Sequence, residues 1–278
     1  MTLATKSLTI DELEKRSKWV RLNVFEDTVR AKKGHLGGTF SCTDILVALY
    51  YAGIMRFDKD NLQWKERDRF LIGKGHASLA LFHIWENLGI LDKDILATYG
   101  SNGGLGGQLD ITIPGAEHNT GSLGHAIGVG AGIALAAKLD RLSSKVFFMI
   151  GDAECDEGAI WESVMFAAEH KLNNLIGIID RNRLSVTDIV EDDKGSGRIE
   201  DKLQACKWAC RVIDGHSFRD ILNAFKDLDS LDRPLMIIAN TVKGKGVSFM
   251  ENGIKWHHSI PTEEETIQAR LELTGAMS

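Results

Sequence analysis

Residues 146–185 read VFFMIGDAECDEGAIWESVMFAAEHKLNNLIGIIDRNRLS, and this stretch decides the fold. Two nearly continuous apolar runs, at residues 146–150 and 175–179, predict buried parallel strands, and the segment between them is long enough for a crossover helix. Polar residues follow each run, with Asp152 after the first and Asn182 after the second. Because the carboxyl ends of parallel strands lie at one edge of a sheet, we expect both side chains at a ligand site.

The rest of the chain repeats this alternation of strands and helices. A third apolar run at residues 235–239 predicts another strand, and Thr9 with Glu12 forms a capping-box pattern for a helix that ends near Gly34. The other expected segments are helices at residues 43–51 and 77–88 and an irregular glycine-rich loop at residues 99–107. The sequence therefore predicts an α/β fold with a mainly parallel sheet and helices on both faces.

Length and composition fit an ordinary globular protein. The chain has 278 residues, 44% hydrophobic and 26% charged, which excludes disordered and fibrous classes, and we expect a single domain over residues 1–278. A net charge of −6 gives no electrostatic reason to expect nucleic acid. We find no signal peptide pattern and no apolar run long enough to cross a bilayer, so we expect no membrane association.

The cysteines indicate a reducing compartment. Cys42, Cys155, Cys206 and Cys210 are too few and too scattered for a disulfide framework, which favours the cytoplasm. Cys206 and Cys210 have the spacing of one helical turn, but no second cysteine pair or nearby histidine pair completes a zinc site. We expect these two to pack on a helix.

Asp152 and Asn182 are candidate ligands for a hard divalent cation. A carboxylate and an amide oxygen suit Mg²⁺, which also keeps water and substrate phosphates as ligands. An aspartate after a strand is equally common as a helix cap, so the residue types alone leave both interpretations open.

The segment from Gly151 to Asn182 resembles the thiamine diphosphate motif, a GDG sequence followed thirty residues later by Asn, in the form that transketolases use. The resemblance implies that Asp152, Asn182 and the backbone carbonyl of Leu184 hold Mg²⁺, which in turn holds the diphosphate of the cofactor. Ala153 replaces the second glycine of the motif, which crowds the turn without removing a ligand.

Four further segments resemble transketolases in the same order, and together the matches cover nearly the whole chain. They are AKKGHLGG at residues 31–38, RDRFLIGKGHASLAL at 67–81, PGAEHNTGSLGHAIGVGAG at 114–132 and GKGVSFMENGIKWHH at 244–258. The resemblance implies catalytic roles for His35, His76 and His257, with His76 and His257 also at the cofactor. It places Gly121 and Leu123 near the cofactor rings. Histidine suits proton transfer to and from sugar hydroxyls near neutral pH.

Three charged residues are weaker candidates. Glu157 and Glu162 follow the metal motif on the same predicted helix, where the resemblance implies a subunit contact that links cofactor sites. Lys243 lies in a glycine-spaced loop that can approach a diphosphate. A solvated surface position is the ordinary alternative for all three.

Gln108 departs from the family pattern. Transketolases have a GHPE-like segment here, whereas this chain reads GQLD, so an amide replaces an expected active-site histidine. Glutamine can hydrogen-bond a sugar hydroxyl but cannot act as an acid or base near neutral pH. We therefore expect altered donor or acceptor preference with cofactor binding retained.

The resemblance also implies a partner chain. In this superfamily the glutamate that assists the cofactor's pyrimidine ring belongs to a second, pyrimidine-binding module, which this sequence lacks. We expect that module on a separate C-terminal transketolase subunit, in an α2β2 assembly that acts on sugars or sugar phosphates. The expected reaction moves a two-carbon ketol unit from a ketose to an aldose or another aldehyde.

The sequence offers three alternative functions. The α subunit of a 2-oxo acid dehydrogenase shares the cofactor but lacks the histidine-containing series of segments. A nicotinamide enzyme is disfavoured because residues 128–132, GVGAG, lack the GxGxxG spacing and follow no strand. A non-catalytic scaffold subunit remains open, and measuring cofactor binding would separate it from an enzyme.

Overall fold

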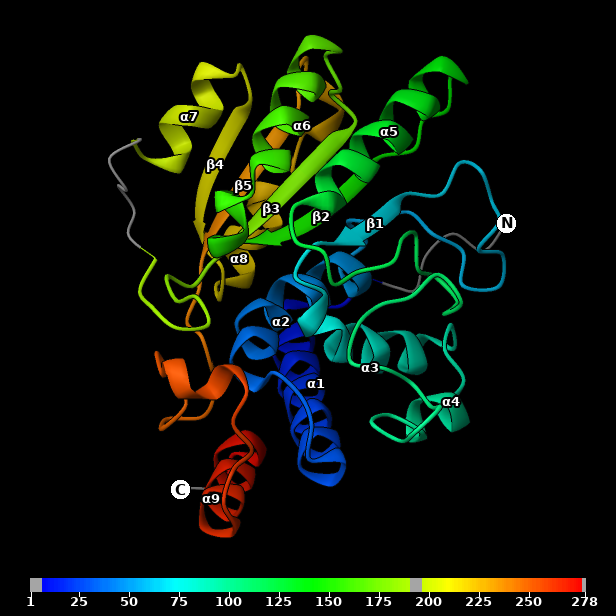
Figure 1. The fold of residues 1–278 in the computed structure, drawn as a ribbon. Coiled ribbons are helices and arrows are strands. Elements are labelled where there is room, and N and C mark those ends of the chain that lie inside the picture. The colour runs from blue at the N-terminus through cyan, green and yellow to red at the C-terminus, as the bar shows by residue number, and fades with distance from the viewer. Residues whose placement is uncertain (1–6, 191–196, 277–278) are drawn as a thin grey trace.

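A computed structural model describes residues 7–190 and 197–276, and its centre is one parallel sheet. The five strands are β1 (Arg69–Ile72), β2 (Val146–Gly151), β3 (Leu175–Arg181), β4 (Ala209–Asp214) and β5 (Leu235–Asn240). They lie in the order β1-β2-β3-β5-β4, and every neighbouring pair is parallel (Figure 1). This confirms the predicted α/β class.

Helices cover both faces of the sheet, as predicted. The longer ones are α1 (Ile10–Ala31), α2 (Leu36–Tyr51), α3 (Ser78–Leu88), α5 (His125–Leu139), α6 (Gly158–Glu169) and α9 (Glu263–Thr274). The short helices are α4 (Lys93–Ala97), α7 (Ile199–Ala205) and α8 (Phe218–Ala224). Helices α5 and α6 lie side by side on one face, whereas α1, α2 and α3 lie on the other (Figure 1).

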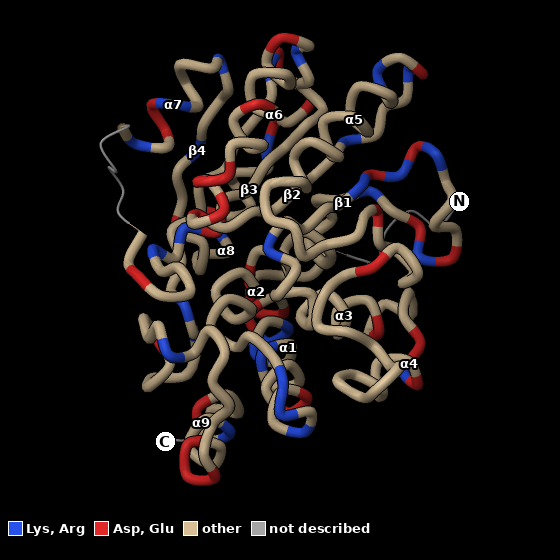
Figure 2. The backbone as a smooth tube through the Cα atoms, viewed as in Figure 1, with Lys and Arg blue, Asp and Glu red and all other residues tan. Residues whose placement is uncertain are grey.

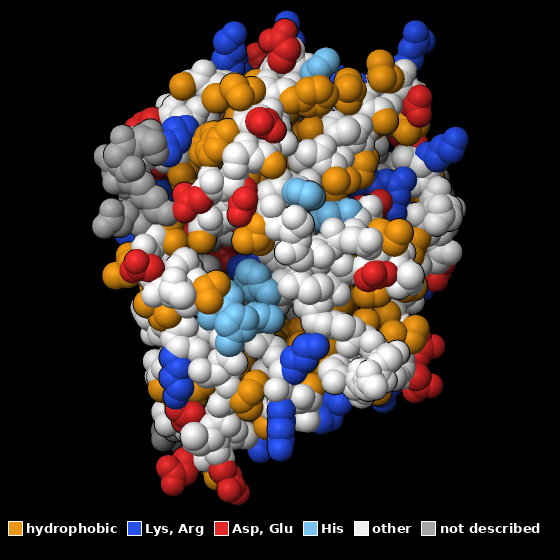
Figure 3. Space-filling view, viewed as in Figure 1, with side chains coloured by type: hydrophobic (Ala, Val, Ile, Leu, Met, Phe, Trp, Pro, Cys, Tyr) orange, Lys and Arg blue, Asp and Glu red, His pale blue; other side chains and the backbone are white. Residues whose placement is uncertain are grey.

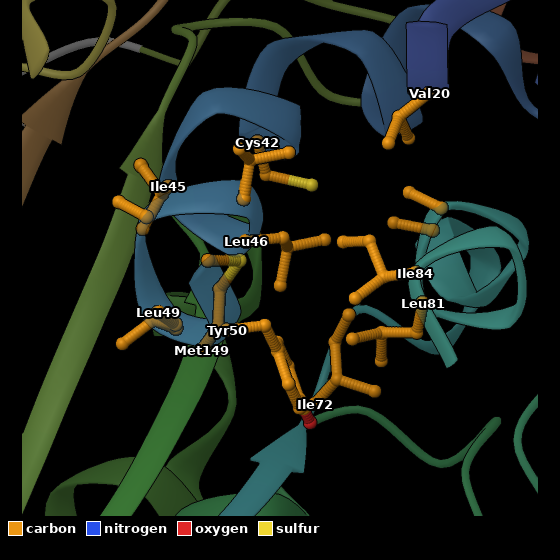
Figure 4. Packing of buried hydrophobic residues seen from close by; sticks show 14 of the residues in the cluster. Val20, Cys42, Ile45, Leu46, Leu49, Tyr50, Ile72, Leu81, Ile84 and Met149 are labelled. Carbon is orange, nitrogen blue, oxygen red and sulfur yellow. The ribbon is translucent and has the colours of Figure 1, made fainter. Parts of the chain in front are cut away.

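Alternating strand side chains supply the two cores. Met149 of β2 and Ile72 of β1 point toward α2 and α3, where Leu46 and Ile84 contact the same cluster (Figure 4). The intervening residues, such as Phe148, join a second cluster beneath α5 and α6. Burial on both faces explains why these strands read as continuous apolar runs.

Helix α2 begins seven residues before the predicted start at residue 43. Its first turn contains Gly37 and Gly38, which in sequence suggest a loop. A Cβ atom on Gly37 would lie 3.0 Å from the Trp256 carbonyl oxygen, and one on Gly38 would lie 2.8 Å from His76 Nε2. These glycines are therefore required by close packing against the site and not by a turn of the backbone.

Several other predictions can be compared with the structure. The capping box at Thr9 is present and α1 ends at Ala31, close to the predicted stop. The glycine-rich loop at residues 99–107 is irregular, as predicted, with turns and bends and no helix or strand. The short strand β1 and the half-exposed edge strand β4 were not predicted, because neither forms a long apolar run.

The prediction for the last two cysteines was wrong. Cys206 ends α7 and Cys210 lies on β4, so they do not share a helix. Lys207 between them takes a left-handed conformation (φ 64°) that turns the chain into the strand. Both thiols pack against the second core, and all four cysteines, which lie in the described ranges, are unpaired.

Candidate active site

The candidate site is a cavity of about 260 Å³ at the carboxyl ends of β1, β2, β3 and β5. Segments that follow these strands form its walls, together with the start of α2, the loop before α5 and η4 (Ile254–His257). The predicted site residues that line it are His35, His76, Gln108, Gly121, Leu123, Gly151, Asp152, Ala153, Asn182, Leu184, Lys243 and His257. Figure 2 shows acidic and basic positions of the backbone close together near the ends of β2 and β3.

Asp152 and Asn182 lie together at one end of the cavity, as their strand positions predict. Asp152 is buried, and its carboxylate accepts hydrogen bonds from the backbone N–H groups of Ala153 at 2.9 Å and Arg183 at 2.5 Å. Arg183 has φ 62°, a left-handed turn that folds the end of β3 back toward Asp152. Burial and the nearby charge of Asp180 raise the pKa of Asp152 to about 6.

This end of the cavity fits a cation. The Asp152 carboxylate is buried near the charge of Asp180, and a bound divalent ion would compensate this negative charge. The Leu184 carbonyl accepts a hydrogen bond of 3.3 Å from the Lys243 ammonium, which also donates to the Ser185 carbonyl at 2.7 Å. The Leu184 carbonyl therefore already contacts a positive charge. A carboxylate, an amide and a backbone carbonyl are hard oxygen ligands of the kind that Mg²⁺ takes.

Lys243 itself is buried among other positive or polar groups. Burial and the charge of Lys74 lower the pKa of Lys243 to about 8. Its Nζ also lies 3.2 Å from His257 Nδ1. A buried ammonium beside a cavity is available to bind an anion such as a diphosphate.

A buried ion pair that sequence analysis did not predict lies next to the cavity. The Lys74 ammonium contacts the Asp180 carboxylate and donates to the Gly38 carbonyl at 2.7 Å. The hydroxyl groups of Ser41, at 2.6 Å, and Thr241 also donate to Asp180. Burial alone would raise the pKa of Asp180, but the Lys74 charge and the hydrogen bonds lower it by more, so the carboxylate is ionised. The pair joins β1, α2, β3 and the loop after β5.

Glu154 is a second buried residue that sequence analysis missed. Its carboxylate accepts from the N–H of Gly124 at 2.9 Å and of Gly151 at 3.1 Å, and burial raises its pKa. A Cβ atom on Gly73 would collide with this carboxylate. Glu154 therefore ties the end of β2 to the start of α5. The signal in the sequence was its place two residues after Asp152.

Three histidines also line the cavity. The ring centroids of His35 and His76 are 5.4 Å apart, and those of His76 and His257 are 5.1 Å apart. Burial lowers the pKa of all three, to about 4 for His35 and about 3 for His257, with further lowering by neighbouring His and Lys residues. The three rings are therefore neutral at pH 7, and each offers one N–H and one free nitrogen.

Gln108 lies between this cavity and a second one lined by the glycine-rich loop. Its Oε1 accepts a hydrogen bond of 3.1 Å from the Thr120 hydroxyl. Gly75 has no room for a side chain, because a Cβ there would collide with Gln108 and Thr120. With Oε1 directed at Thr120, the NH₂ group of Gln108 is the end left for a ligand.

The two glutamates lie outside the cavity. Glu157 precedes the first residue of α6 and Glu162 lies one turn into that helix, and both are exposed. Of the predicted site residues, these two are not brought to the cavity wall.

Residues 14–276 match the protein family described as the transketolase thiamine diphosphate binding domain. The chain is 39% identical to an apulose-4-phosphate transketolase subunit of Phocaeicola vulgatus, over 96% of this chain and 95% of that protein. It is 34% identical to a 6-deoxy-6-sulfo-D-fructose transketolase subunit of a Clostridium species, over 95% of this chain and 98% of that protein.

A solved structure agrees with these relatives. The transketolase of Campylobacter jejuni aligns with a TM-score of 0.89 and 27% identity, over 96% of this chain and 43% of that one. The chain thus spans less than half the length of that transketolase. The parallel sheet and its strand-end cavity define an α/β protein with a ligand site at the strand ends, and its relatives are transferases. The chain belongs to the transketolase family and matches its thiamine diphosphate-binding part, so thiamine diphosphate is its cofactor.

The family match decides between the alternative enzyme classes. The relatives are transketolases and transketolase subunits, which contradicts the dehydrogenase and nicotinamide alternatives. Across residues 7–190 and 197–276, no helix combines the length and apolar character needed to span a membrane.

Proposed function

We propose that this chain, together with a separate chain that carries the pyrimidine-binding module, transfers a two-carbon ketol unit from a ketose to an aldose or related aldehyde. The observation that carries the proposal is the convergence of hard oxygen ligands and neutral histidines on one cavity. The naming of two relatives as transketolase subunits supports the division into two chains.

Asp152, Asn182 and the Leu184 carbonyl would hold Mg²⁺, and Lys243 would neutralise the diphosphate. The glycines at the cavity wall favour this, since a Cβ on Gly121 or Gly151 would meet no protein atom within 4 Å and leaves room for a ligand. Ala153 donates its N–H to Asp152, so the alanine leaves the carboxylate in position. When bound, thiamine diphosphate supplies the carbanion chemistry of ketol transfer.

The histidines would bind sugar hydroxyls and move their protons. A neutral imidazole can accept a proton through one nitrogen while the other donates a hydrogen bond. All three rings are half-buried; His35 and His257 adjoin the exposed ring of His258, whereas His76 lies against Gly38 in the first turn of α2. We assign the first two to substrate hydroxyls and His76 to the cofactor side.

Gln108 would bind a substrate hydroxyl without proton transfer. Its NH₂ group is a donor only, so it favours substrates that present an acceptor oxygen at that position. The two relatives are named for apulose-4-phosphate and 6-deoxy-6-sulfofructose, which supports a specialised sugar or sugar phosphate as the substrate here.

The partner subunit would cover the surface formed by α5 and α6, in an α2β2 assembly. Glu157 and Glu162 lie on this surface, beside the exposed apolar side chains of Met165 and Phe166. Exposed apolar groups rimmed by charges are typical of protein interfaces. The four unpaired cysteines support a cytoplasmic location.

The test is ketol transfer by this chain mixed with its candidate C-terminal partner, with thiamine diphosphate and Mg²⁺, against each chain alone. We expect activity only in the mixture. Asp152→Asn should abolish it and weaken Mg²⁺-dependent cofactor binding, whereas Asp156→Asn, the same change at an exposed position, should not. Full activity of this chain alone would contradict the two-chain proposal. Absence of cofactor binding would favour the scaffold alternative.

A further inference from the structure

Three histidines meet at the rim of the cavity, and the catalytic proposal uses only two of them. The ring centroids of His35 and His258 are 4.6 Å apart, those of His257 and His258 are 4.6 Å apart, and those of His35 and His257 are 5.5 Å apart. One ring nitrogen from each lies within 4.8 Å of the other two. Figure 3 shows histidine side chains gathered at the centre of this face, beside a hollow.

This arrangement has the chemistry of a transition-metal site. In a tetrahedral zinc site, Zn–N distances of about 2.0–2.1 Å place the ligand nitrogens roughly 3.4 Å apart, so these rings need to close by only about 1–1.5 Å. His258 is exposed and the other two are half-buried, which leaves the site open to an incoming ion. Imidazole suits Zn²⁺, whereas Mg²⁺ prefers oxygen ligands.

We propose that His35, His257 and His258 bind a divalent transition-metal ion such as Zn²⁺, at a site separate from the Mg²⁺ site, and that this ion inhibits the enzyme. Three histidine ligands leave a fourth position for water, the arrangement found in open zinc sites. The inhibition rests on the proposed function, because it assumes that His35 and His257 handle substrate. The binding itself does not.

The protonation states favour binding. Metal ions require neutral imidazoles, and a histidine that must first lose a proton binds them less well. Burial, followed by neighbouring positive groups, lowers the pKa of His35 to about 4 and of His257 to about 3. Both rings are therefore neutral near pH 7, so a metal ion does not compete with a proton for the ring nitrogen.

Two cations near the site set a limit on affinity. The positive charge of Lys33 contributes to the lowered pKa of His35, and Lys243 Nζ lies 3.2 Å from His257 Nδ1. An incoming ion must therefore approach from the side of His258, away from Lys243. Because like charges repel across this distance, we expect micromolar binding, weaker than in a structural zinc site.

The binding test uses the full chain without a polyhistidine tag, titrated with ZnCl₂ in a non-chelating buffer at neutral pH. We expect one Zn²⁺ per chain and no competition from Mg²⁺. His258→Gln should weaken binding by about tenfold or more, since even indirect ligand partners change metal affinity 10–100-fold. His258→Cys should restore it, because a thiolate is also a zinc ligand. His170→Gln, at an exposed histidine on α6, is the matched control and should change nothing.

The functional test adds Zn²⁺ to the assembled enzyme with thiamine diphosphate and Mg²⁺ in excess, and each rate is normalised to the same variant without zinc. We expect the inhibition constant to rise with His258→Gln in parallel with the binding constant. Equal zinc binding by His258→Gln and His170→Gln, or no binding by the unmodified chain, would overturn the site. Zinc binding without inhibition would overturn the inhibitory role alone, and it would leave the ketol-transfer proposal untouched.

Discussion

Asp44 connects the stability of the fold to the position of a site residue. Its carboxylate forms a bidentate ion pair with Arg21, at 2.7 and 2.8 Å, and lies 2.7 Å from His216 Nδ1. The other ring nitrogen of His216 accepts the backbone N–H of Val242 at 2.8 Å. Since Val242 precedes Lys243, this buried chain of contacts from α1 and α2 fixes the backbone at the cavity.

We expect Asp44→Asn to lower the free energy of unfolding by about 3–5 kcal/mol, because it leaves the buried Arg21 guanidinium without its counter-charge. Burial alone raises the pKa of Asp44, but Arg21 and His216 lower it more, so the net shift is downward. Because the pKa of Asp44 is lowered in the folded state, the ionised carboxylate stabilises the fold at pH values above the unfolded pKa of about 3.9. This stabilisation is lost as the pH falls below that value. Urea unfolding of both proteins from pH 7 to pH 3 measures the difference, which should shrink only at the acidic end.

The control for this prediction is Glu26→Gln. Glu26 pairs with Arg270 at 2.7 Å, but both side chains are exposed. Surface pairs contribute about 0–1 kcal/mol, so the substitution should change the stability little. A loss as large as that of Asp44→Asn would show that burial does not decide the effect.

Gln108→His tests substrate preference at the level of one side chain. We expect the relative rates for a panel of ketose donors and aldehyde acceptors to change by roughly 2–10-fold, the range for one gained or lost hydrogen bond. The affinity for thiamine diphosphate should stay the same, because Gln108 is not among the residues proposed to hold Mg²⁺ and the diphosphate. Gln204→His, at an exposed position on α7, is the control. Unchanged relative rates would contradict the assignment.

At the level of elements, α2 shows how packing against the site opposes helix propensity. Gly38→Ala adds a favourable helix residue, yet its Cβ would lie 2.8 Å from His76 Nε2. Overpacking of a buried position costs about 1–3 kcal/mol, so we expect a net loss of stability and weaker cofactor binding. Gly132→Ala on α5 meets no atom within 4 Å and should stabilise the isolated chain by up to about 1 kcal/mol. Thermal unfolding of both variants gives the comparison, and equal shifts would refute it.

The sequence predicted those elements whose local pattern agrees with their environment. The fully buried strands β2, β3 and β5 read as apolar runs, and the residues after β2 and β3 pointed to Asp152 and Asn182. Strand β4 was missed because its side chains are half exposed, and the start of α2 was missed because its glycines serve packing. The ion pair of Lys74 and Asp180 joins residues 106 positions apart, a contact that no local pattern can reveal.

At the level of the whole molecule, α6 presents an exposed apolar surface that the proposed partner subunit would cover. Glu162 and Phe166 lie one turn apart on the exposed side of the helix, and the Phe166 side chain remains 41% exposed. Among the ring contacts of the described residues, Phe166 contacts only His170, at a centroid distance of 4.3 Å. An aromatic side chain in this position is a typical anchor for a partner protein.

Phe166→Asp should therefore weaken assembly with the C-terminal partner by about 30-fold or more, as expected when an anchor worth at least about 2 kcal/mol is lost. The isolated chain should keep its fold and its zinc binding, because Phe166 lies outside both buried cores and the histidine site. Ile267→Asp on α9 introduces the same charge at another exposed apolar position, on a different element, and it should leave assembly intact. Sedimentation of the mixed chains measures both. If Ile267→Asp weakens assembly and Phe166→Asp does not, the partner binds at α9, and the cavity edge beside α5 and α6 must be completed in another way.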